Sequence, residues 1–179
     1  MTSLHSIAAP EALHPSLWLA SQLAHSSARC IDTGHPTLSA QLPGGGWPTG
    51  TLNELLLQQA GIGEMRLLRP SLQTVARRRI VLLQPPHPPQ ALALAALGIK
   101  PSELVWVRTS RSADALWAAE QILRSGSCGA LLFWHAHARG EALRRLNLAA
   151  QSGETLFFML RPLAASQDAS PAPLRLSLR

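Results

Sequence analysis

Short apolar runs alternate with longer helical segments from Thr51 onward, and this alternation constrains the fold more than any other feature of the sequence. The segments between the runs repeat their apolar residues with the period of a helix. The runs themselves are TLNELLL, RIVLLQ, ELVWVR, GALLFWH and TLFFMLRP. Strands that alternate with helices are typical of parallel sheets. The sequence therefore predicts an α/β domain with a mainly parallel β-sheet of five core strands, flanked by helices.

The length of 179 residues suits a single domain with short tails. Residues 1–32 are expected to form a tail and a leading helix, because four apolar residues share one helical face: Leu19, Ala20, Leu23 and Ala24. Residues 33–163 are expected to form the α/β core, and residues 164–179 a loop and an edge strand. Within the core, Ser112 is expected to cap a helix and Gly126 to end it.

Composition indicates where the protein acts and which metals or partners it can bind. No apolar run is long enough to span a membrane, and the N-terminus lacks the pattern of a secretory signal, so we expect a cytoplasmic protein that works near the nucleoid. Cys30 and Cys128 have no spacing typical of a disulfide or a metal site, so no metal is expected. The net charge of +6 comes almost wholly from arginine, with Lys100 the only lysine. This balance favours contact with nucleic acid or an acidic partner, and it is equally typical of a biased genomic composition.

The segment QQAGIGEM follows the first predicted strand, where a phosphate loop would lie. A phosphate loop needs converging backbone N–H groups, a lysine for the outer phosphates and a hydroxyl for magnesium. Here Gly61 and Gly63 are present, but Glu64 replaces the lysine and Met65 replaces the hydroxyl. Like charges at short range repel by roughly 4 kcal/mol at an intermediate dielectric, so we expect no nucleotide cofactor. In a second interpretation, the glycines merely form a strand-to-helix turn, with Glu64 near the helix N-terminus.

The segment IDTGHPTLSAQLPGGGWPTGTLNELL resembles the segment that leads into the first core strand of RecA. From about Leu17 to the C-terminus the chain is also similar to the ImuA family, on the motifs LPGGGWP, GIGE, RSADALWAAEQILRSG, LRRLNLAAQ and SPAPLRLSL. The resemblance implies a RecA-like fold. It also places Pro86 where RecA-type ATPases carry a catalytic glutamate, and Trp134 where they carry an acidic residue for magnesium. Neither side chain can do that chemistry, so no catalytic residue is expected and the protein is not expected to be an enzyme.

The ImuA resemblance implies a non-catalytic adaptor of the bacterial mutasome, which carries out translesion synthesis and damage-induced mutagenesis in the SOS response. The implied partners are ImuB, the polymerase ImuC, RecA and single-stranded or primer-template DNA, with self-association through edge strands as a further expectation. Two alternatives stay open. One is a cell-division inhibitor like SulA, which would bind the tubulin-like protein FtsZ, and the other is a divergent RecA-type ATPase.

Basic side chains supply most candidates for contact with DNA or a partner. Arg77, Arg78 and Arg79 stand at the end of a predicted helix, where they also complement the helix dipole. The remaining candidates are Arg108, Arg111, Arg139, Arg144, Arg145 and Trp47, a tryptophan that we expect at the surface. The other tryptophans of the core region are expected to pack inside: Trp106, Trp117 and Trp134. The motif HAH at 135–137 and the solvated His87 are not expected to bind metal or act as a base.

Overall fold

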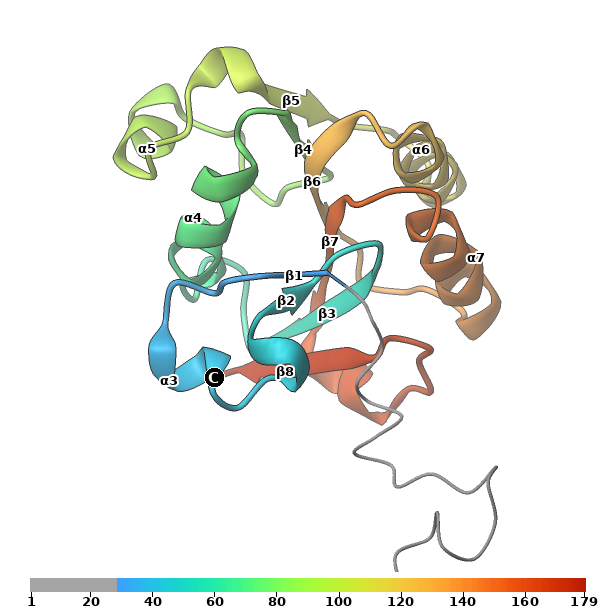
Figure 1. The fold of residues 1–179 in the computed structure, drawn as a ribbon. Helices are drawn as coiled ribbons and strands as arrows, with labels where there is room; N and C mark the ends of the chain where they lie inside the picture. Colours follow the sequence, from blue (N-terminus) through green and yellow to red (C-terminus); the bar gives the residue numbers. More distant parts are fainter. Residues whose placement is uncertain (1–28) are drawn as a thin grey trace, which may run out of the picture.

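The structure is a computed structural model that describes residues 29–179 (Figure 1). The predicted leading helix lies outside the described residues. The first half of the described chain contains β1 (Cys30–Ile31), α3 (Pro36–Ser39), the 3-10 helix η1 (Pro43–Gly45), β2 (Trp47–Pro48), β3 (Thr51–Leu57), α4 (Glu64–Val75), β4 (Arg79–Leu83) and α5 (Ala91–Ala96). The second half contains η2 (Pro101–Glu103), β5 (Leu104–Val107), α6 (Ser112–Ser125), β6 (Cys128–Trp134), α7 (Gly140–Ala150), β7 (Leu156–Pro162), η3 (Leu163–Gln167) and β8 (Leu174–Leu178).

Six strands form one sheet in the order β5-β4-β6-β7-β3-β8. Every neighbouring pair in this sheet is parallel. The five predicted apolar runs form β3 to β7, and the C-terminal run forms β8 at the edge beside β3. The predicted α/β fold with a mainly parallel sheet is confirmed.

Helices cover both faces of the sheet, with α4 and α5 on one side and α6 and α7 on the other (Figure 1). Successive residues of a strand point to opposite faces, so each of the strands β3 to β7 contributes to two hydrophobic clusters. Leu55 and Leu57 of β3 pack in the cluster that contains Leu68 of α4, whereas Leu52 packs in the cluster that contains Leu143 of α7. This burial on both faces explains why the strands are continuous apolar runs.

The prediction for the two ends of α6 is confirmed at the C-terminal end only. Gly126 ends the helix with a left-handed φ of 57°, as predicted. The expectation that Ser112 caps the helix is wrong, because Arg111 takes the N-cap position and Ser112 is the first helical residue. The Ser112 Oγ instead lies 3.2 Å from Nε2 of His135, so its hydrogen bond goes to the end of a neighbouring strand.

The glycine-rich loop before β3 is part of the folded body. A Cβ on Gly46 would lie 2.4 Å from the carbonyl oxygen of Ile31, so only glycine fits where β2 passes β1. The next residue, Trp47, is 0% exposed and packs edge-on against Phe158 of β7, with ring centroids 5.1 Å apart. The expected surface position of Trp47 is therefore wrong, and its buried indole is not available for contact with DNA or a partner.

Candidate functional site

The loop between β3 and α4, where the sequence predicts a degenerate phosphate loop, is closed by its own glutamate. Gly61 and Gly63 have positive φ angles of 83° and 130°, which glycine adopts without strain. The carboxylate of Glu64 accepts hydrogen bonds from the backbone N–H groups of Gly61, at 2.9 Å, and Gly63, at 3.1 Å. The backbone donors that could bind a phosphate therefore bind a carboxylate of the same chain.

The position of Glu64 is stable for local reasons. It is the first residue of α4, where a negative charge is favoured by the helix dipole, and it is only 3% exposed. Met65, the next residue, packs against the hydrophobic cluster that contains Leu68. The loop is thus a strand-to-helix turn with Glu64 at the helix N-terminus, and its interpretation as a degenerate phosphate loop stays a prediction.

A pocket with a volume of about 330 Å³ lies beside the closed loop, at the carboxyl ends of β3, β6 and β7. Gln58 and Gln59 line it from the loop, and Trp134 and His135 line it from the end of β6. Burial lowers the pKa of the His135 imidazole, which favours its neutral form. No aspartate, glutamate, cysteine or lysine is among the described residues that line the pocket. Arg161 also lines it, but its guanidinium is paired with Glu54 and Asp168, so the pocket offers mainly apolar surface and amide groups.

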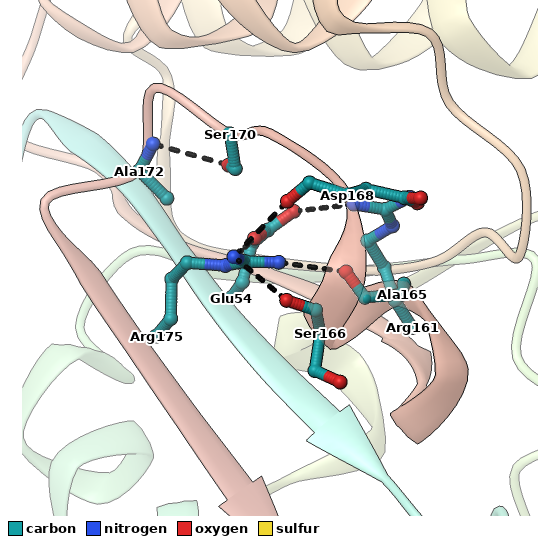
Figure 2. Close-up of polar contacts among 8 residues, drawn as sticks. All are labelled: Glu54, Arg161, Ala165, Ser166, Asp168, Ser170, Ala172 and Arg175. Atoms are coloured by element: carbon teal, nitrogen blue, oxygen red, sulfur yellow. Dashed lines mark hydrogen bonds and ion pairs between the residues drawn. The ribbon is translucent and has the colours of Figure 1, made fainter.

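A buried ion network fastens the C-terminal segment to the sheet (Figure 2). Arg161 of β7 donates a hydrogen bond to the Glu54 carboxylate of β3 at 2.9 Å, and a second to Asp168 at 2.8 Å. The other Glu54 oxygen accepts from Nε of Arg175 in β8 at 2.6 Å, and Arg175 also donates to the carbonyl of Ala165 at 2.8 Å. Sequence analysis missed this network. Its signal was a charged residue inside each of two apolar runs, TLNELLL and TLFFMLRP.

The predicted basic candidates do not share one surface. The turn after α4 holds Arg77 and Arg78, and Arg79 begins β4, so these side chains stand at the amino end of the parallel sheet. The carboxyl ends of the strands carry three others, in the segments after β5 and β6: Arg108, Arg111 and Arg139. Helix α7 carries Arg144 and Arg145. A single phosphate-tracking surface would have to cover both ends of the sheet.

One of these arginines has a structural partner. Glu120 of α6 is 6% exposed, and its carboxylate forms ion pairs with Arg145 of α7 and, at 2.7 Å, with Arg124 of its own helix. Because Glu120 is buried, the pair with Arg145 helps to hold α6 and α7 together. Contact with DNA or a partner stays a prediction for the exposed arginines.

Two tryptophans that were expected in the core are exposed. Trp106 is 44% exposed and Trp117 is 62% exposed, so the prediction of core packing is wrong for both. Trp106 lies on β5, which among residues 29–179 has a neighbouring strand on one side only. The guanidinium carbon of Arg108 lies 5.9 Å from the centre of the Trp106 ring. Trp134 is partly buried against the α4 side of the sheet.

The described residues contain neither a metal-binding cluster nor a membrane-spanning helix. No group of three or more His, Cys, Asp or Glu side chains in residues 29–179 is arranged to hold a metal ion. Likewise, no helix between residues 29 and 179 combines the length and apolar character that a membrane crossing needs.

Fold and site together define an α/β protein with a parallel sheet, in which Glu64 closes the loop between β3 and α4. No protein-family model matches the chain. The chain is 30% identical, over 87 residues, to the curated cell division inhibitor SulA of Edwardsiella piscicida. The match includes 49% of this chain and 52% of that protein, so the chain spans about half the length of its curated relative.

A solved structure is also similar. The crystal structure of SulA from Pseudomonas aeruginosa matches with a TM-score of 0.49 and 23% identity. The match covers 61% of this chain and 97% of the solved chain. At this level the similarity is a description of shape and carries no functional argument.

These comparisons correct the functional prediction from sequence. The curated relative is a cell division inhibitor, so the assignment to the ImuA family and to DNA repair and mutagenesis by the mutasome is wrong as the main interpretation. The similarity to SulA, which was an alternative, is the part of the prediction that the comparisons support. Binding of ImuB, ImuC, RecA or DNA, and self-association, are not tested by any of these findings.

Proposed function

We propose that the chain inhibits cell division in the manner of SulA, by binding a protein of the division machinery. The observation that carries the proposal is the 30% identity over 87 residues to a curated cell division inhibitor. The target we propose is FtsZ, the tubulin-like division protein that the resemblance to SulA implies. The place of action is then the cytoplasm.

We further propose that the protein acts by binding alone, without nucleotide and without catalysis. The closed loop supports this, because Glu64 holds the N–H groups of Gly61 and Gly63 and adds a negative charge where phosphates would approach. Calorimetry with ATP and magnesium tests this point. We expect no heat of binding at about millimolar nucleotide, and saturable binding would favour the divergent ATPase instead.

Controlled expression in a rod-shaped bacterium tests the inhibitor function. We expect cells to elongate without dividing as expression rises, and to resume division when expression stops. The Trp47→Ala variant is the control, because it removes a fully buried side chain, should leave less folded protein in the cell and should therefore elongate cells less. Cells that keep normal length while the folded protein accumulates would rule the function out.

A further inference from the structure

A groove with a volume of about 560 Å³ crosses the sheet beside α6, at the edge formed by β5. Its floor is apolar, with Val81 from β4, Val105 and Val107 from β5, and Ile122 from α6. Val81 lies opposite Val105 in the parallel register, so the two valines are side by side. Burial raises the pKa of the Cys128 thiol, which also lines the groove, so the floor carries no charge at neutral pH.

The amino end of this groove is basic. Arg77, Arg78 and Arg79 all line it and all are exposed. Alternate residues of a strand point to the same face, so Arg79 points to the face that carries Val81. Arg78 donates a hydrogen bond to the carbonyl of Gly126, and within residues 29–179 no carboxylate forms an ion pair with any of the three arginines. The groove therefore joins an apolar floor to a positive charge that the described residues do not neutralise.

The strand beside the groove has an open edge. β5 pairs with β4 on one side, and no strand in the described part of the chain pairs with its other side. An open edge presents backbone N–H and C=O groups to which an extended segment can add as a further strand. Such a segment would lie beside β5, and its alternate side chains would point to the face of the sheet that carries Val105 and Val107.

We propose that this groove binds an extended, acidic segment of a partner protein, which adds to β5, places apolar side chains on the valine floor and directs carboxylates to Arg77–Arg79. The chemistry of the floor favours a peptide over nucleic acid, since single strands bind by stacking on aromatic side chains and none of the residues that line the groove is aromatic. The proposal goes beyond the division-inhibitor function, because it concerns a surface that would serve any partner with such a segment.

Fluorescence anisotropy with the full-length chain tests the proposal. The probe is a fluorescein-labelled peptide in which valine and serine alternate and a run of glutamates follows at one end, so that valines can face the floor while carboxylates reach Arg77–Arg79. The comparison peptide has serine in place of each valine. We expect the glutamate–valine peptide to bind with a Kd of about 100 µM or tighter at low salt, and the serine peptide to bind at least about fivefold more weakly. Equal affinity for the two peptides would overturn the proposal, because the valine floor would then play no part.

Two charge-matched double variants locate the site. Arg77→Glu with Arg79→Glu changes the groove and keeps Arg78, whereas Arg139→Glu with Arg144→Glu makes the same change in charge elsewhere. We expect the first variant to weaken peptide binding at least about tenfold and the second by less than about twofold. Circular dichroism checks that both variants fold.

Three other results would overturn the proposal. An equal loss in both double variants would show non-specific attraction to the basic surface as a whole. Tighter, groove-dependent binding of a labelled single-stranded oligonucleotide would assign the groove to nucleic acid. A dimer of the wild-type chain that the Arg77→Glu, Arg79→Glu variant dissociates would show that a second copy of this chain occupies the groove.

Discussion

Arg161 and Glu54 form a salt bridge of 2.9 Å between β7 and β3, and their side chains are 1% and 0% exposed. A charge buried this deeply is tolerated only when it is paired, because its hydration is lost on folding. Glu54 also binds Arg175 of β8, so one carboxylate connects the strands on either side of β3. The network therefore adds to the backbone pairing of β8 with β3 in holding the C-terminal segment on the sheet.

Removal of Arg161 should destabilise the fold strongly. Arg161→Met leaves Glu54 buried with one of its two cationic partners missing, and we expect the free energy of unfolding to fall by about 3–5 kcal/mol, measured by urea denaturation. Glu154→Gln is the control, because it removes an exposed ion pair with Arg29 and should change stability by less than about 1 kcal/mol. Similar effects of the two substitutions would contradict the structural role of the buried network.

Removal of the loop carboxylate should also cost stability. Glu64→Ala removes two hydrogen bonds to backbone N–H groups and a favourable charge at the start of α4, so we expect a loss of about 1–2 kcal/mol in urea denaturation. Glu141→Ala is matched to it, since Glu141 also stands in the first turn of a helix but is exposed, and its effect should stay within about 0.5 kcal/mol. If Glu64→Ala leaves the free energy of unfolding unchanged, the carboxylate does not close the loop in solution.

The buried and exposed tryptophans should respond differently to truncation. Trp47→Ala removes a side chain that is 0% exposed, and we expect it to destabilise the protein by about 3–5 kcal/mol. Trp117→Ala removes a side chain that is 62% exposed, and its effect should be below about 1 kcal/mol. Thermal denaturation of the two variants gives the comparison, and a reversed order would place Trp47 at the surface after all.

His135 should make the stability depend on pH. Burial lowers its folded pKa below the ordinary value of 6.5, so between those two values the unfolded chain binds a proton that the folded chain does not. The contribution of neutral His135 to the free energy of unfolding is therefore fully present above pH 6.5. It is lost as the pH falls from 6.5 through the folded pKa.

Urea denaturation at about pH 7.5 and about pH 5.5 checks this sign. The wild type should lose stability at the lower pH, and the His135→Gln variant should lose less. The exposed His87 provides the control, because His87→Gln should keep the wild-type dependence on pH. If His135→Gln behaves like His87→Gln, the neutral, buried form of His135 is not the cause.

Strand positions and strand direction could be predicted from the sequence because both depend on local patterns. β3, β4, β6 and β7 are buried on both faces and read as continuous apolar runs, and Gly126 ends α6 as its conformational freedom suggests. The place of a carboxylate in the loop could also be predicted from the sequence, because Glu64 is only a few residues along the chain from Gly61 and Gly63, whose N–H groups it binds.

Features that depend on long-range packing could not be predicted in the same way. Trp47 follows three glycines in the sequence, and it is buried because β2 packs against the core cluster that contains Phe158. Trp106 and Trp117 lie in apolar segments, but β5 is an edge strand and Trp117 lines an open pocket between α6 and α7, so both are exposed. Whether these tryptophans are buried depends on where their helix or strand lies in the fold, and a local sequence pattern does not predict that position.

The measurement that tests the proposed function most directly is light scattering by FtsZ polymers in the presence of GTP, with increasing amounts of the purified full-length chain. We predict that scattering falls in proportion to the added protein, without any requirement for ATP, because the chain binds the division protein and keeps it out of polymers. Unchanged scattering with the chain in excess over FtsZ would contradict the proposal that the protein inhibits division in the manner of SulA.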